Sequence, residues 1–158
     1  MSLTDEIEAH LSNLGAPYKI LEHEAVTTSA DAARVRGVEL SSGAKALLIK
    51  AKGDYALFVL SAALQVDWKA VKSILSTKDA RLATEEELLD RTGLTKGSVP
   101  PFGNLLGIPV YVDNSILEED LVRFNAASLV KSIEMSGGAL LNAVEGEWAV
   151  FAKSTDRD

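Results

Sequence analysis

The sequence has no cysteine, only two histidines and no long hydrophobic run. Without cysteine the chain has no disulfide, no thiolate metal site and no cysteine nucleophile, and two histidines are too few for a histidine-rich metal centre. The longest mostly apolar run, residues 56–66, is too short to span a bilayer. The N-terminal residues are acidic and lack the apolar core of a signal peptide. These absences predict a cytoplasmic protein that uses no metal and no cofactor and does not associate with a membrane.

What is present is typical of a globular protein. The chain has 158 residues, of which 47% are apolar and 25% are charged. That length fits a single domain spanning residues 1–158 and can bury a substantial core. The net charge of −7 disfavours non-specific binding to nucleic acid, which depends on neutralising phosphates, but it still permits a local basic patch.

Hydrophobic periodicity and capping residues predict an alternation of short elements without a regular βαβ repeat. We expect helices over residues 3–15, 27–37, 67–75, 84–93 and 136–144. We expect strands over residues 18–23, 79–83, 108–113, 121–128, 130–135 and 147–153, and a β-hairpin over residues 45–62 with Gly53 and Asp54 at its turn. This pattern favours a mixed α/β fold, with a curved, largely antiparallel sheet or barrel and helices packed outside it.

Lys45 is the most informative charged residue. In an extended strand it shares a face with Leu47 and Ile49, whereas Lys50 lies on the opposite face. One interpretation is a lysine at a strand end whose stem covers apolar surface. The other is a functional lysine, because buried lysines are uncommon unless they are paired.

The stretch GSVPPFG, residues 97–103, holds two of the four prolines and two of the eleven glycines. Proline fixes φ and removes an N–H group, while glycine reaches backbone angles that other residues avoid. The stretch is therefore either a tight connection or a preformed loop whose main chain faces a ligand. We expect Gly97 to serve the close approach of a ligand, so that Gly97→Ala abolishes activity and leaves the melting temperature nearly unchanged. The alternative is that Gly97 serves a positive φ, in which case the alanine also costs stability.

Other polar residues leave two interpretations open. His23, at a strand end, is an acid–base group or a half-buried residue satisfied by local hydrogen bonds, and His10 is expected to be solvated. Asp113 caps the helix that follows it or lies at a cleft rim. Thr28 is a hydroxyl donor or a helix cap. No stretch matches a nucleophile elbow, a phosphate-binding glycine loop or a metal cluster.

Three segments taken together resemble the YbaK/prolyl-tRNA editing-domain family. They are KILEHEAVTTSADAA, then GAKALLIKAKGDYALFVL, then TGLTKGSVPPFG running into IPVYVD. The resemblance extends from about residue 18 to about residue 153, and it implies a small mixed α/β domain that hydrolyses mischarged aminoacyl-tRNA, typically tRNA(Pro) carrying alanine or cysteine. It implies tRNA as the partner, an aminoacyl-tRNA synthetase as a further possible partner, and a monomer or weak homodimer.

The resemblance also implies roles for individual residues. Lys45 corresponds to the family's lysine and is expected to bind the terminal adenosine or to polarise the ester. The expected substrate-binding residues are Gly97, Ser98, Val99, Pro100, Pro101, Phe102, His23, Thr28 and Asp113. Two departures put the recognised amino acid in doubt: Ala46 stands where many relatives have threonine, and Ala126 and Ala127 stand where many have glycine.

The mechanism must use what the chain has. Without cysteine or an evident serine–histidine pair, covalent catalysis is disfavoured. An aminoacyl ester is already activated, so positioning and electrostatics suffice for attack by water. The competing hypothesis is a module that binds an aminoacyl or nucleotide-like ligand, or docks a synthetase, without turnover.

Overall fold

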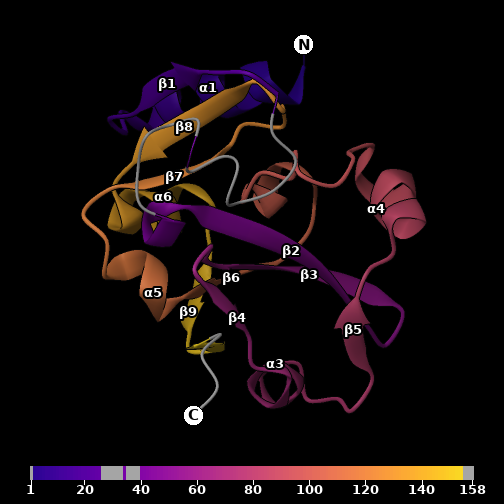
Figure 1. Cartoon of the computed structure of the whole chain (residues 1–158). Coiled ribbons are helices and arrows are strands. Elements are labelled where there is room, and N and C mark those ends of the chain that lie inside the picture. The colour runs from indigo at the N-terminus through magenta and orange to yellow at the C-terminus, as the bar shows by residue number, and fades with distance from the viewer. Residues whose placement is uncertain (1, 26–33, 35–39, 155–158) are drawn as a thin grey trace.

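The computed structural model describes residues 2–25, 34 and 40–154 (Figure 1). Its helices are α1 (Leu3–Leu14), α3 (Trp68–Ile74), α4 (Glu85–Thr92), α5 (Asn114–Leu117) and α6 (Gly137–Ala143), with 3₁₀ turns η1 (Leu40–Ser42) and η2 (Gly103–Leu105). Its strands are β1 (Lys19–Glu22), β2 (Ala44–Ala51), β3 (Asp54–Ser61), β4 (Leu64–Val66), β5 (Ala80–Leu82), β6 (Val110–Asp113), β7 (Val122–Asn125), β8 (Lys131–Met135), β9 (Glu147–Ala149) and β10 (Ala152–Ser154). The helix expected over residues 27–37, and with it Thr28, falls outside the described residues.

These strands form three sheets, so the mixed α/β prediction is confirmed. The central sheet has the order β5-β2-β3-β6-β9, and smaller sheets have the orders β1-β8-β7 and β10-β4. Five of the seven described strand pairs are antiparallel, while β3–β6 and β6–β9 are parallel. The described sheets do not close into a barrel, which settles the alternative that the sequence left open.

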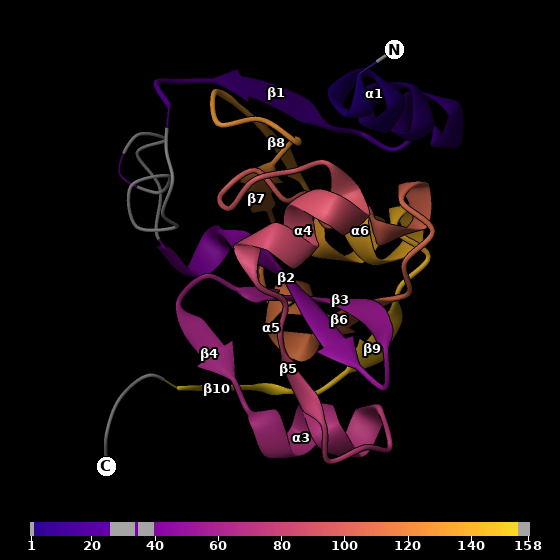
Figure 2. The same ribbon diagram turned by 90° about the vertical axis from the view of Figure 1, so that its right-hand side faces the viewer.

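The sheets are stacked along one direction of the molecule. In both views the three-stranded sheet and α1 lie at one end, and α3 and the β4–β10 pair lie at the other (Figures 1 and 2). The central sheet lies between them, so both of its faces are covered. Within the described part of the chain, every helix is too short or too polar to cross a bilayer.

Burial on both faces explains the apolar runs of β2 and β3. Leu48 and Leu57 belong to one hydrophobic cluster, and their neighbours Ile49 and Phe58 belong to another on the opposite face. Alternation in an extended strand thus divides a continuous apolar run between two cores. The predicted shared face of Leu47 and Ile49 is confirmed, since Leu47 packs against the cluster that contains Ile49.

Local signals placed the helix ends correctly. Asp67 caps α3 by accepting from the backbone amides of Lys69 and Ala70. Thr84 and Glu87 form a complete capping box at the start of α4. The left-handed backbone of Gly93 ends that helix, as the sequence predicted.

Two boundaries differ from the expectation. The hairpin turn consists of Lys52 and Gly53, both with positive φ, and Asp54 already pairs with Ala51. The expected strand 147–153 is two strands, because the chain leaves the central sheet after Ala149 and pairs with β4 from Ala152 onward.

His10 also differs from its expectation. It is half buried: its Nε2 lies 2.7 Å from the carbonyl oxygen of Ala143, and its ring contacts Phe102 edge-on. The acidic residues around it in α1 suggested a solvated helix face, but α1 turns His10 toward α6.

Candidate active site

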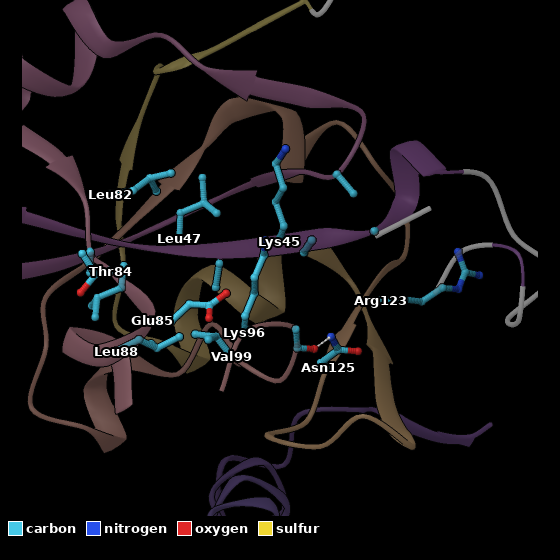
Figure 3. Close-up of a pocket in the computed structure, with 17 residues that line it drawn as sticks. Lys45, Leu47, Leu82, Thr84, Glu85, Leu88, Lys96, Val99, Arg123 and Asn125 are labelled. Atoms are coloured by element: carbon cyan, nitrogen blue, oxygen red, sulfur yellow. Dashed lines mark hydrogen bonds between the residues drawn. The ribbon is translucent and has the colours of Figure 1, made fainter. Parts of the chain in front are cut away.

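A cavity of about 530 Å³ lies where the start of β2 meets α4, β7 and the proline loop, residues 97–103 (Figure 3). Its size is within the range of small-molecule sites. The lining residues are Gly43, Ala44, Lys45, Ala46, Leu47, Leu48, Ala62, Leu82, Ala83, Thr84, Glu85, Leu88, Lys96, Gly97, Val99, Arg123 and Asn125. The cavity therefore combines an apolar wall with several cations.

The wall formed by α4 is held to the central sheet by Glu87. Its carboxylate accepts two hydrogen bonds from Arg81 of β5 (2.7 and 3.0 Å), one from the backbone amide of Thr84 (2.9 Å) and one from Lys50 of β2 (2.9 Å). These bonds, with Arg81 the largest contributor, hold the pKa of Glu87 far below its ordinary value. The same helix turn brings Leu88 into the cavity wall.

Lys45 lies at the start of β2 and lines the cavity. Its ammonium donates to the carbonyl oxygen of Leu64 at 2.5 Å, and burial lowers the pKa of the side chain. No carboxylate pairs with it among the described residues. In Figure 3 its side chain extends from β2 away from Val99 and Asn125, which lie on the other side of the strand. Lys45 is thus a half-buried cation held only by a neutral acceptor.

The proline loop faces the cavity with its first part only. Gly97 and Val99 line the cavity, and the backbone at Gly97 has a φ of 91°, which favours glycine. The side-chain amide of Asn125 donates to the carbonyl oxygen of Gly97 and fixes the loop against β7. The positive φ means that Gly97 serves the backbone conformation as well as the cavity.

The rest of the loop points into the protein. Pro100, Pro101 and Ser98 are buried outside the cavity lining, and the Ser98 amide donates to the carbonyl of Thr95 at 3.2 Å. Phe102 is 0% exposed and packs against the ring of Phe124. The structure thus places these four residues where they can support the loop but not contact a ligand in the cavity.

Asp113 is also away from the cavity. It is 3% exposed and caps α5 through the Ser115 amide at 2.9 Å. Its other oxygen accepts from the amides of Phe151 (2.7 Å) and Ala152 (3.0 Å), where the chain crosses from β9 to β10. Of the two interpretations of Asp113, the structure supports the helix cap.

His23 makes a pair that the sequence did not reveal. Its Nε2 lies 2.7 Å from the hydroxyl of Ser132, and its Nδ1 lies 2.8 Å from the carbonyl oxygen of Glu24. A serine–histidine pair can be a nucleophile and base. Ser132, however, is 0% exposed, and neither residue lines the cavity. Ser132 lies in β8 and His23 directly follows β1, so the pair joins the end of β1 to the neighbouring strand and fits a structural role.

Four polar lining residues were not singled out from the sequence: Glu85, Lys96, Arg123 and Asn125. The spacing of Arg123 and Asn125, two apart in a predicted strand, indicates a shared face but not what that face meets. Lys96 directly precedes Gly97, so the loop prediction included its neighbour. Within the described residues, no group of three histidine, aspartate or glutamate side chains could hold a metal ion.

The two departures from the family pattern lie in different places. Ala46 lines the cavity, so a methyl group stands there in place of a hydroxyl-bearing side chain. Ala126 is buried beside the cavity wall and Ala127 has a φ of 60°, a conformation that glycine adopts without strain. Neither Ala126 nor Ala127 lines the cavity, so only the first departure alters its surface directly.

Comparison with known proteins agrees with this architecture. The model of the aminoacyl-tRNA editing domain family matches residues 23–143. The multifunctional Ser/Thr-tRNA deacylase ProXp-y of Escherichia coli K12 is 32% identical over 151 residues, covering 92% of this chain and 90% of that protein. The uncharacterized protein YwhH of Bacillus subtilis is 28% identical over 132 residues, covering 82% of this chain and 83% of that protein.

Solved structures show the same fold. The hypothetical protein APE2540 superposes with a TM-score of 0.86 at 23% identity, covering 94% of this chain and 99% of that one. A protein provisionally described as a trans-editing enzyme for prolyl-tRNA synthetase superposes with a TM-score of 0.84 at 24% identity, covering 98% of this chain and 99% of that one. The family match spans most of the chain, so the protein belongs to the aminoacyl-tRNA editing-domain family, and its activity is that of an aminoacyl-tRNA deacylase.

Proposed function

We propose that this protein hydrolyses the ester bond of misacylated tRNA that carries a small amino acid. Serine and threonine are the first candidates, because a relative 32% identical to this chain is named a Ser/Thr-tRNA deacylase. Alanine and cysteine on tRNA(Pro), which the resemblance to the YbaK family implied, are the alternative. Both alternatives are small side chains, and the same experiment separates them.

One observation carries the proposal: Lys45 and the backbone of Gly97 line one cavity of about 530 Å³. The apolar residues Leu47, Leu82 and Leu88 line the same cavity and exclude water from part of it. A cavity with this lining accommodates a small side chain and the ribose to which it is esterified.

The chemistry requires only water and positioning. Water attacks the ester carbonyl carbon, the bond between that carbon and the ribose oxygen breaks, and the ribose oxygen takes a proton. The products are the free amino acid and uncharged tRNA. Lys45 exchanges the neutral Leu64 carbonyl for the developing oxyanion, which attracts an ammonium group more strongly. The Gly97 main chain orients the aminoacyl group for the attack.

The test is a panel of tRNAs charged with serine, threonine, alanine or cysteine, incubated with the purified protein and followed by loss of the ester. We expect release of serine and threonine above the rate of spontaneous hydrolysis. Release of alanine or cysteine alone, from tRNA(Pro), would assign the alternative substrate. No release from any member at high protein concentration would contradict the proposal and favour a binding module.

The same proposal names the partners. The protein acts on free or synthetase-released aminoacyl-tRNA, and it does so as a monomer or weak homodimer. Association with an aminoacyl-tRNA synthetase is tested by sedimentation of the purified chain with the synthetase that charges the preferred tRNA.

A further inference from the structure

The cavity is cationic in an acidic protein. Lys45, Lys96 and Arg123 line it, and Glu85 is the acidic residue among its lining side chains, whereas the whole chain has a net charge of −7. Neither lysine forms an ion pair with a described carboxylate. A local excess of positive charge on an acidic protein indicates an anionic ligand at that place.

Arg123 is the most rigidly held of these cations. Its Nε donates to Glu134 on the neighbouring strand β8 at 2.8 Å, and its side chain is only 16% exposed. That bond uses one of the five N–H groups of the guanidinium. The two terminal nitrogens have no hydrogen-bond partner among the described residues. Glu134 therefore orients the guanidinium and leaves its outer donors for a ligand.

The position of Arg123 separates the cavity into two ends. Leu82 and Thr84 lie at one end of the residues drawn in Figure 3, and Arg123 lies at the other, with Lys45 between them. Arg123 and Asn125 are two residues apart in β7, so their side chains share a face, and Asn125 contacts the Gly97 loop. Arg123 thus lies on the wall of the cavity that carries the Gly97 loop, at the end farther from Leu82 and Thr84 (Figure 3).

The substrate has a matching division. On the terminal adenosine of tRNA, the aminoacyl ester is on the 2′ or 3′ oxygen and the phosphate is on the 5′ oxygen, on opposite sides of the ribose. Lys45 and Gly97 both line the cavity, and Arg123 lies at one end of it (Figure 3). If the aminoacyl group occupies the part of the cavity lined by Lys45 and Gly97, the phosphate is left to a group at the Arg123 end. Two terminal nitrogens of an oriented arginine match two phosphate oxygens.

We propose that Arg123, oriented by Glu134, binds the 5′-phosphate of the terminal adenosine and so sets the position of the ester in the cavity. This rests on the proposed function, since it names a contact to the substrate of that reaction. It leaves Lys45 for the ester itself, which decides between the two roles that the sequence left open for that lysine.

The test compares two small esters of the amino acid released fastest in the tRNA panel: its 3′ ester with 5′-AMP and its 3′ ester with adenosine, which lacks the phosphate. We expect the wild-type protein to favour the AMP ester about 10-fold in kcat/KM, chiefly through KM, as one charge-assisted contact provides. Arg123→Gln should reduce this preference to about one, and Arg123→Lys should retain part of it. Arg91→Gln is the matched control, because it removes the same charge from a residue that does not line the cavity.

The outcomes separate the two proposals. Equal wild-type rates for the two esters, or a full preference retained in Arg123→Gln, would overturn the phosphate contact while leaving the deacylase function in place. If aminoacyl-tRNA is hydrolysed but neither ester is, inhibition of that reaction by AMP and by adenosine gives the same comparison, and equal inhibition overturns the contact. Failure to hydrolyse any ester or aminoacyl-tRNA overturns the proposed function instead. If Arg123→Gln unfolds, equal wild-type rates for the two esters still overturn the proposal, and a preference that Arg123→Lys retains in full would assign the phosphate to another residue.

Discussion

Replacing Gly97 by alanine tests two consequences of one backbone angle. The φ of 91° lies in the left-handed region, where a Cβ costs about 1–2 kcal/mol. Alanine also restricts the unfolded chain, which returns about 0.4–1 kcal/mol. The net loss is then about 1 kcal/mol, or a fall of about 2–4 °C in melting temperature for a chain of this size. We therefore expect Gly97→Ala to lose stability. A glycine that served only the close approach of a ligand would predict no such loss.

The same methyl group enters the cavity, since Gly97 lines it. We expect Gly97→Ala to lower kcat/KM for deacylation at least about 10-fold, in addition to its effect on stability. The assays are thermal unfolding followed by circular dichroism and ester hydrolysis at a temperature well below both melting temperatures.

Gly93→Ala is the matched control. Gly93 has a φ of 74°, does not line the cavity, and has open space where a Cβ would stand. It should lose similar stability and keep its activity. An active Gly97→Ala protein would remove the loop from the site, and an unchanged melting temperature would refute the argument from backbone strain.

Four further substitutions, one of them a control, test the remaining assignments. Lys45→Ala should lower deacylation about 100-fold, a loss of about 2.7 kcal/mol in transition-state stabilisation, without changing the melting temperature. The ammonium of Lys50 pairs with Glu87, and Lys50→Ala should change activity little. Equal losses of activity in Lys45→Ala and Lys50→Ala would contradict the role of Lys45. Asp113→Asn should cost about 1–3 kcal/mol in urea unfolding, because an amide nitrogen then faces backbone donors, with activity retained. The lowered pKa of Glu87 makes its contribution to stability complete above its unfolded pKa of about 4.3 and lost as the pH falls further. The melting temperature of Glu87→Gln should accordingly fall less than that of the wild type between pH 6 and pH 3. An identical pH profile for the two proteins would contradict the stabilising role of the Glu87 ion pairs.

The sequence by itself determined the elements that depend on neighbouring residues. The helices α3 and α4 begin after Asp67 and Thr84, because a side chain can cap an amide two or three residues away regardless of the rest of the fold. Glu87 completes the capping box of α4. The hairpin of β2 and β3 was predictable because two apolar runs on either side of a glycine turn are a local signal. The resemblance to a family of editing domains then supplied Lys45 and Gly97, and both line the cavity.

The tertiary structure decided which side chains face the cavity and which face the core. Phe102 and Asp113 stand in stretches that match the family, yet one packs in the core and the other ties a helix to a strand crossing. Arg123 and Asn125 carry no local signal, and they reach the cavity because β7 lies beside the start of β2 and the proline loop. Asn125 contacts Gly97, which is 28 positions away in the sequence, and Arg123 pairs with Gly43, which is 80 positions away. Such contacts depend on how the sheets stack. A one-dimensional pattern fixes the face of a strand that a residue occupies, but it does not fix what that face meets.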